Sequence, residues 1–119
     1  MNVSDMKPGI FYMAHPYTGN ELANFLLANS CMAELIKRGY IVHSPITHTY
    51  PPSRIMDFHE WGFWMDYDRV VLENTKWSGL ILCPGWEDSK GCCVEKLWFE
   101  EINIKVLYYE DLVKESYAQ

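Results

Sequence analysis

Three acidic residues carry the carboxylate groups that are needed to break a glycosidic bond. Asp66 and Asp68 lie two residues apart in "WMDYDRVV", and Glu95 ends the turn-rich stretch "CPGWEDSKGCCVE". Glycosidic cleavage takes one carboxylate to attack or stabilise the sugar carbon, and often a second group to handle the proton of the leaving group. Glu95 with Asp68 or Asp66 could fill these roles, because residues two apart on a helix face different directions and one of the two would enter a site. The alternative is that they lie on a solvated helix face.

The stretch before Glu95 predicts the start of a helix, capped by Ser89 or Asp88 and running to about Asn103. Free N–H groups and a partial positive charge make a helix N-terminus an anion site, so Ser89 and Gly91 could hold a phosphate. Simple capping by Ser89 is the alternative. The same dipole predicts an ionised Glu95, which suits a nucleophile or base.

The sequence contains no common motif for nucleoside triphosphates, dinucleotides or zinc. The chain contains no Walker sequence and no Gly-x-Gly-x-x-Gly fingerprint. The histidines (15, 43, 48 and 59) and cysteines (31, 83, 92 and 93) match no zinc motif. We therefore expect no metal, no cofactor and four reduced thiols in a cytoplasmic protein. His15 and His43 end predicted strands, where they could line a cleft or serve as caps or core.

Composition limits the class of protein further. A chain of 119 residues with 49% hydrophobic residues is expected to form one domain spanning residues 1–119. The net charge of −6 argues against binding a nucleic-acid polymer, which needs a basic surface. The N-terminus carries no apolar signal-peptide core, and no stretch is apolar enough for a membrane span.

Apolar runs and helical patterns alternate along the chain. The predicted strands are 9–14, 40–46, 79–83 and 104–109, and the predicted helices are 21–38, 59–75, about 89–103 and 110–119. The last-but-one helix is expected to bury Val94, Leu97, Trp98 and Ile102. Residues 47–58 contain two prolines and no period, which predicts a long loop.

This alternation predicts a single-domain, three-layer α/β fold of Rossmann or flavodoxin-like type. Its open, mostly parallel sheet would have about four to five strands flanked by helices. Ligands bind such sheets beyond the carboxyl ends of the strands, where the strand order reverses. The candidate binding segments are therefore "HPYTGN", "HSPITH" and "PGWEDSKG".

Three motifs in order resemble the nucleoside 2-deoxyribosyltransferase-like superfamily, especially its small phage and bacterial members. They are "FYMAHPYTGN", "GYIVHSPITH" and "DYDRVVLENTKWSGLILCPGWEDSKGCCVE". The resemblance implies a hydrolase or transferase acting at the N-glycosidic bond of a nucleoside or nucleotide. It also implies a homodimer or larger homo-oligomer that acts in nucleotide metabolism without metal or cofactor.

The resemblance also suggests roles for individual residues. Glu95 would attack the anomeric carbon to give a covalent glycosyl-enzyme, Asp68 would assist departure of the base, and Tyr12 would lie near both. Ser89 matches a serine that holds a 5′-phosphate, so a nucleoside 5′-monophosphate is the expected substrate. The "HPYTGN" loop lacks the arginine found in nucleotide hydrolases, a role that Lys90 or Arg54 could take. The remaining expected substrate-binding residues are His15, Pro16, Tyr17, Ser44, Asp66, Trp86 and Gly91.

Two other functions are compatible with the same sequence. A non-catalytic nucleotide-binding or sensing module would keep the helix terminus at Ser89 and Gly91 but have no use for Glu95 as a nucleophile. A hydrolase of a larger N-glycoside such as NAD would need a cleft that residues 47–58 do not obstruct.

Overall fold

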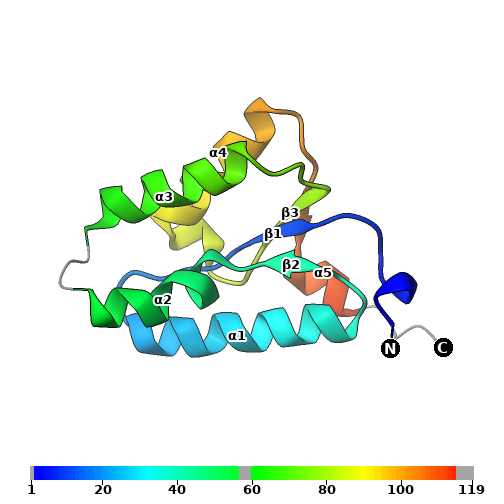
Figure 1. The fold of residues 1–119 in the computed structure, drawn as a ribbon, viewed down its shortest axis with the longest axis horizontal. Helices are drawn as coiled ribbons and strands as arrows, with labels where there is room; N and C mark the ends of the chain where they lie inside the picture. Colours follow the sequence, from blue (N-terminus) through cyan, green and yellow to red (C-terminus); the bar gives the residue numbers. More distant parts are fainter. Residues whose placement is uncertain (1, 57–59, 115–119) are drawn as a thin grey trace.

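The computed structural model describes residues 2–56 and 60–114, and in these ranges a parallel four-stranded sheet is covered by helices on both faces (Figure 1). The chain has an α/β fold of Rossmann or flavodoxin-like type. In chain order the elements are the 3-10 helix η1 (Val3–Asp5), β1 (Phe11–Ala14), α1 (Glu21–Lys37), β2 (Val42–His43), α2 (Pro45–Ile55), α3 (Trp61–Glu73), β3 (Gly79–Leu82), the 3-10 helix η2 (Trp86–Asp88), α4 (Lys90–Glu101), β4 (Val106–Tyr108) and α5 (Tyr109–Lys114).

The strand order is β2-β1-β3-β4, and every neighbouring pair is parallel. β1 and β3 lie in the centre and are buried along their whole length. Continuous apolar runs are typical of such strands, because helices cover both faces of a parallel sheet. From β1 the chain continues to β2 at one edge of the sheet, and it then returns to form β3 and β4 on the other side of β1. The strand order therefore reverses between β1 and β3.

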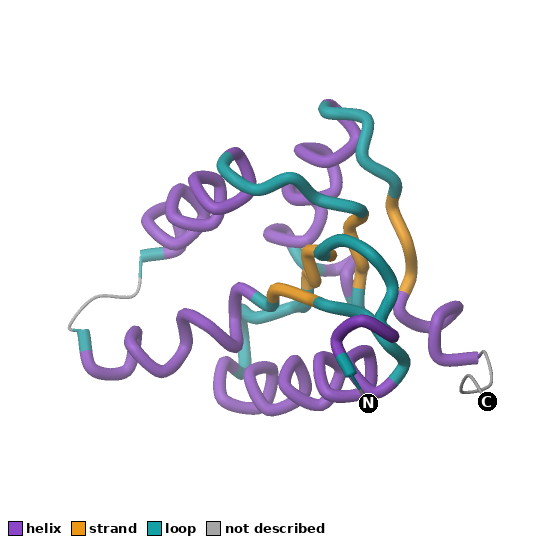
Figure 2. Tube along the Cα trace, turned by 45° about the vertical axis from the view of Figure 1, so that its right-hand side comes forward, coloured by secondary structure: helices purple, strands orange, loops and turns teal. Residues whose placement is uncertain are grey.

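Side chains alternate along the strands and divide the core into two layers. Phe11, Met13, Ile81 and Cys83 face a cluster packed against α1, whereas Tyr12, Ala14, Leu80 and Leu82 face a second cluster that includes Leu72 of α3 and Phe99 of α4. Both views show α1 and α5 on one side of the sheet and α3 and α4 on the other (Figures 1 and 2).

The prediction of a loop over 47–58 is wrong for its described part, because residues up to Ile55 belong to α2. Ser44 accepts a hydrogen bond from the Thr47 N–H at 3.4 Å and so caps the helix. Pro51 and Pro52 lie within α2 but on its exposed side. Tertiary packing offsets the hydrogen bonds that these prolines cannot make, since α2 lies against α1. Residues 57 and 58 of the predicted loop fall outside the described part of the chain.

Other predicted boundaries move by a few residues. The strand over 40–46 is reduced to β2, because Ser44 already caps α2. The predicted buried face of α4 is wrong for two of its four residues, whereas Val94 and Trp98 are half-buried and Trp98 packs against the core. Leu97 and Ile102 are exposed, and the buried residues are Cys92, Glu95 and Phe99. His59 and residues 115–119 of the predicted helices lie outside the described residues.

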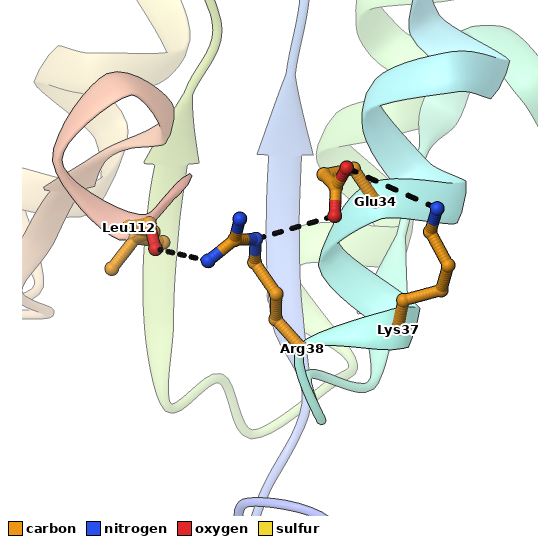
Figure 3. A network of polar contacts seen from close by, with 4 residues as sticks. All are labelled: Glu34, Lys37, Arg38 and Leu112. Atoms are coloured by element: carbon orange, nitrogen blue, oxygen red, sulfur yellow. Dashed lines mark hydrogen bonds and ion pairs between the residues drawn. The ribbon is translucent and has the colours of Figure 1, made fainter. Parts of the chain in front are cut away.

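Polar contacts hold α5 against the end of α1 (Figure 3). The Arg38 guanidinium donates to the Leu112 carbonyl oxygen at 3.5 Å and to the Glu34 carboxylate at 3.2 Å, and Lys37 lies 4.0 Å from the same carboxylate. These contacts fix the position of α5 beside the sheet. Within 2–56 and 60–114, no helix combines the length and the apolar character needed to cross a membrane.

Candidate active site

The cleft lies at the carboxyl ends of β1 and β3, where the strand order reverses. Open α/β sheets bind ligands at this point because the loops that follow the two strands diverge there. Ala14 and His15 line the cleft from the β1 side, and Ser89, Gly91 and Glu95 line it from the segment that follows β3. The predicted location is therefore where the structure forms a cleft.

Tyr12 and Glu95 make a buried hydrogen bond beneath this cleft. The Tyr12 hydroxyl donates to Oε2 of Glu95, and these side chains are 0% and 6% exposed. The Tyr12 ring meets the Trp77 ring edge-on and the Phe99 ring at a tilt, with centroid distances of 5.1 and 5.2 Å. Because the ring is enclosed in this way, the hydroxyl has a fixed position, and so does the carboxylate that it holds.

Asp68 of α3 lines the same cleft as Glu95, whereas Asp66 is exposed. The two aspartates lie two residues apart, and a helix directs such positions to different sides. Of the two aspartates, Asp68 lines the cleft together with Glu95, and Asp66 does not.

Burial makes both carboxyl groups weaker acids than usual. It raises the pKa of Asp68 to about 7 and the pKa of Glu95 to about 8. The Tyr12 hydrogen bond opposes the rise at Glu95, and the negative charge of Asp68 adds to it. The prediction that the helix dipole keeps Glu95 ionised is thus wrong, because Glu95 lies beyond the first turn of α4, where the dipole has faded and desolvation dominates.

Helices α2 and α3 form the outer walls of the cleft. The residues that α3 contributes besides Asp68 are large and share one helical face: Trp61, Trp64 and Met65. The opposite wall comes from α2 and contains Pro45, Ile46, Thr49 and Ser53. Such a lining, mostly apolar with a few convergent polar groups, is typical of small-molecule sites.

A shallower hollow continues the cleft toward the N-terminus of α4. It shares Tyr17, Thr18, Trp61 and Ser89 with the inner part, and its further lining includes Pro16, Gly85 and Lys90. The Lys90 ammonium lies 4.3 Å from the centroid of the Trp61 ring. The Ser89 hydroxyl accepts from the Cys92 N–H at 3.2 Å, so it caps α4. The outer hollow therefore combines a helix N-terminus with one cation, Lys90, and one carboxylate, Asp88.

The family model described as domain of unknown function DUF1937 matches residues 9–111. The chain belongs to this family. No curated protein matches the sequence. The part of the chain that forms the sheet, the cleft walls and all three of Tyr12, Asp68 and Glu95 lies inside the DUF1937 match.

Most of the predicted site residues of this DUF1937 domain gather at the cleft. The inner part is lined by Asp68, Glu95, His15, Tyr17, Ser89 and Gly91, and Pro16 lines the outer hollow. Tyr12 reaches the site through its bond to Glu95. Three predicted residues lie elsewhere. Ser44 is buried as the cap of α2, Asp66 is exposed, and Trp86 packs beside Tyr108 with ring centroids 6.0 Å apart.

The aromatic wall of the DUF1937 cleft was not among the predicted site residues. Trp61, Trp64, Met65 and Asp68 follow the spacing i, i+3, i+4, i+7, which marks one face of a helix. That spacing was available as a signal. The α2 wall was missed because its segment was predicted to be a loop. Within 2–56 and 60–114, no three His, Cys, Asp or Glu side chains are grouped as metal ligands would be.

Proposed function

We propose that the protein hydrolyses the N-glycosidic bond of a nucleoside 5′-monophosphate, with transfer of the sugar to a second base as a related activity. The observation that carries the proposal is the Tyr12–Glu95 hydrogen bond beside Asp68 in one cleft. The resemblance of the three sequence motifs to the nucleoside 2-deoxyribosyltransferase-like superfamily supports the same chemistry.

In the proposed reaction, a carboxylate oxygen of Glu95 attacks C1′ of the sugar. The bond from C1′ to the base nitrogen breaks, its electron pair stays with the base, and the Asp68 carboxyl supplies the proton that the base needs. Water then attacks C1′ and releases Glu95 as a carboxylate, while Asp68 takes the proton of the water. The net reaction adds one water molecule and leaves both side chains as they began.

This reaction requires one proton on the carboxyl pair, located on Asp68. Burial raises the pKa of Asp68 to about 7 and that of Glu95 to about 8, so near neutral pH the pair retains a proton that rests mainly on Glu95 and is proposed to pass to Asp68 before the attack. The phenol of Tyr12 donates to Glu95 and thereby favours the ionised form at that position. Tyr12 is accordingly proposed to place the charge on the attacking group.

The outer hollow is the proposed phosphate position. Lys90 supplies a cation there, next to the first turn of α4 and the Ser89 cap. Arg54, the other cation considered from the sequence, lies 3.8 Å from the Glu21 carboxylate and does not line the hollow. Lys90 is therefore the basic residue proposed to replace the arginine that the first loop lacks.

Base release from a panel of ribo- and deoxyribonucleoside monophosphates tests the proposal. Glu95→Ala should abolish the release seen with wild-type protein, and Glu101→Ala on the exposed side of α4 serves as the matched control. Release by wild type that survives in Glu95→Ala would contradict the role of Glu95. The absence of release from every compound, with and without an added acceptor base, would contradict the reaction.

A non-catalytic nucleotide-binding module is a second proposal, favoured by one observation. Because burial raises the pKa of Glu95 to about 8, a protonated Glu95 would act as a hydrogen-bonding group and not as a nucleophile. Under this proposal, calorimetry would detect nucleotide binding to wild type and to Glu95→Gln alike, with no base released by either. An N-glycoside as large as NAD fits less well, since α2 forms a wall at this cleft.

We also propose that the protein acts as a homodimer or larger homo-oligomer in the cytoplasm. Exposed apolar side chains on α1, namely Leu22, Leu26 and Leu27, give two copies a surface to share. Light scattering after size-exclusion chromatography tests this. A monomer at all concentrations, in wild type as in Leu26→Lys, would contradict it.

A further inference from the structure

A second group of titratable side chains lies on the opposite face of the sheet from Tyr12. In the strand register, Ala14 pairs with Leu82 and Leu82 with Tyr108. The next residue of each segment therefore continues the same row beyond the strand ends, and the Cys83 N–H donates to the Ala14 carbonyl at 2.9 Å. Side chains alternate along a strand, so this row faces the α1 side with Met13 and Ile81. Its members are His15, Cys83 and Tyr109.

Helix α1 places Cys31 over this row. Cys31 is half-buried and Cys83 is completely buried. Cys31 and Tyr109 both pack against the core cluster that contains Cys83. Nδ1 of His15 lies 2.8 Å from the Pro16 carbonyl oxygen and donates to it, so Nε2 is the ring nitrogen left for other contacts. α5, which begins at Tyr109, is held against α1 by the bond from Arg38 to Leu112 shown in Figure 3. The four side chains are thus fixed by three strand ends and two helices.

The contacts of Cys31 favour a thiolate. Hydrogen bonds from the Cys83 thiol, together with His15 and Tyr109, lower the pKa of Cys31 to about 5 despite its burial. The same contact and full burial raise the pKa of Cys83, so this thiol keeps its proton. Reactive cysteines occur in such partly exposed surroundings beside histidine, whereas buried thiols without them are inert. Two neighbouring cysteines therefore differ in protonation, because Cys31 favours the thiolate and Cys83 favours the thiol.

We propose that Cys31 and Cys83 form a redox-active pair under the cleft, with Cys31 as the reactive thiol and Cys83 as its resolving partner. Hydrogen peroxide is the two-electron oxidant. The Cys31 thiolate attacks one peroxide oxygen, giving Cys31 sulfenic acid and hydroxide. The Cys83 sulfur then attacks the Cys31 sulfur, the disulfide forms, and the sulfenic oxygen leaves as water with the Cys83 proton.

The pair has a direct connection to the candidate active site through His15. This side chain lines the inner cleft and also contacts Cys31. Formation of the disulfide removes the thiolate that His15 faces, so oxidation would change the charge and position of one cleft residue. The inference does not depend on the proposed glycosidase reaction, because the cysteine chemistry can be measured without any substrate.

Mass spectrometry after treatment with hydrogen peroxide tests the proposal. The wild-type protein should lose two hydrogen atoms and yield a peptide pair linked through Cys31 and Cys83. Cys83→Ser should stop at a sulfenic acid on Cys31 that dimedone traps, and Cys31→Ser should form no link. Cys93→Ser is the matched control and should behave as wild type. A link through any other pair, or no link in the folded wild-type protein, would overturn the proposal.

Alkylation by iodoacetamide gives a second measurement that needs no oxidant. Cys93 is also half-buried, but its thiol donates to the carbonyl oxygens of Trp86 and Glu87 at 3.6 Å and has no contact with a histidine in the described residues. At about pH 6, Cys31 should therefore react about tenfold faster than Cys93 or more. His15→Gln, checked for folding by circular dichroism, should reduce this difference. Equal rates at the two cysteines in wild type would contradict a reactive Cys31.

Discussion

The two faces of the sheet bury titratable groups at the ends of the same strands, yet they affect those groups in opposite ways. On the α3–α4 face, burial raises the pKa of Glu95 to about 8 and that of Asp68 to about 7. On the α1–α5 face, hydrogen bonds lower the pKa of Cys31 to about 5. Depth of burial alone does not explain this difference, because Asp68 and Cys31 are both half-buried and their pKa values shift in opposite directions.

The number of hydrogen-bond donors explains the contrast. Cys31 contacts Cys83, His15 and Tyr109, which together stabilise a negative charge. Glu95 receives one hydrogen bond, from Tyr12, and faces a second carboxyl group, which disfavours its charge. A buried group ionises when donors replace the water that it has lost and keeps its proton when they do not. One face therefore suits proton transfer and the other suits a thiolate.

The largest expected effect separates the two aspartates of α3. Asp68→Asn should lower base release by about 10²–10⁴-fold, because it removes the group that protonates the leaving base. Asp66→Asn, two residues away and exposed, should leave release unchanged and is the matched control. Initial rates with the best monophosphate substrate provide the measurement. Equal losses in both variants would remove the distinction between the cleft carboxyl and the exposed one.

A pH series of unfolding measurements tests the raised pKa values of Glu95 and Asp68. Folding raises the pKa of Glu95 and Asp68 from ordinary values near 4, so the folded chain holds protons that the unfolded chain releases. The free energy of unfolding should therefore fall by about 2 kcal/mol or more as the pH rises from about 4.5 to about 8. Urea denaturation should show this fall, and Glu95→Gln should remove much of it. Glu101→Gln, on an exposed position, should keep the wild-type slope.

Tyr12→Phe removes the hydrogen bond on the carboxylate face. The loss should reduce the free energy of unfolding by about 1–2 kcal/mol, since Glu95 stays buried without this donor. The same change should raise the pKa of Glu95 further, because the Tyr12 bond opposes the effect of burial. Tyr108→Phe, which removes an exposed hydroxyl, is the control for urea denaturation. A Tyr12→Phe protein as stable as wild type would show that the bond contributes little.

The smallest effect is expected from the corresponding change on the thiol face. Tyr109→Phe removes one of several contacts of Cys31 from a half-buried ring, so stability should change by less than about 0.5 kcal/mol. Alkylation of Cys31 should nevertheless slow, because one group that stabilises its thiolate is gone. If instead Tyr109→Phe destabilises the protein as much as Tyr12→Phe, the proposed difference between the faces is wrong.

Much of the fold could be predicted from the sequence, because apolar runs and helical periods alternate cleanly. The exception is α2, where Pro51 and Pro52 indicate a break. The Tyr50 ring stacks on Phe25 of α1, with centroids 4.4 Å apart. That contact comes from packing between segments, so no local pattern contains it.

The site was predictable in its location and less so in its chemistry. Glu95 and Asp68 follow from residue type, spacing and the end of a central strand. The bond between Tyr12 and Glu95 joins residues 83 positions apart, and the sequence supplies no local signal for it apart from the family resemblance. The acidity of Glu95 was predicted with the wrong sign, because desolvation depends on the surrounding helices and not on the position within α4.

The outer strands of the sheet are very short, and this length governs how copies of the chain can meet. β2 has two residues and is followed at once by Ser44 and Pro45, and β4 has three. A foreign strand would find few unpaired backbone groups to join, and proline offers none of its own N–H groups for that purpose. Growth of the sheet from molecule to molecule, the first step toward fibrils, is thereby blocked at both borders. Any association between folded copies must use helices and side chains.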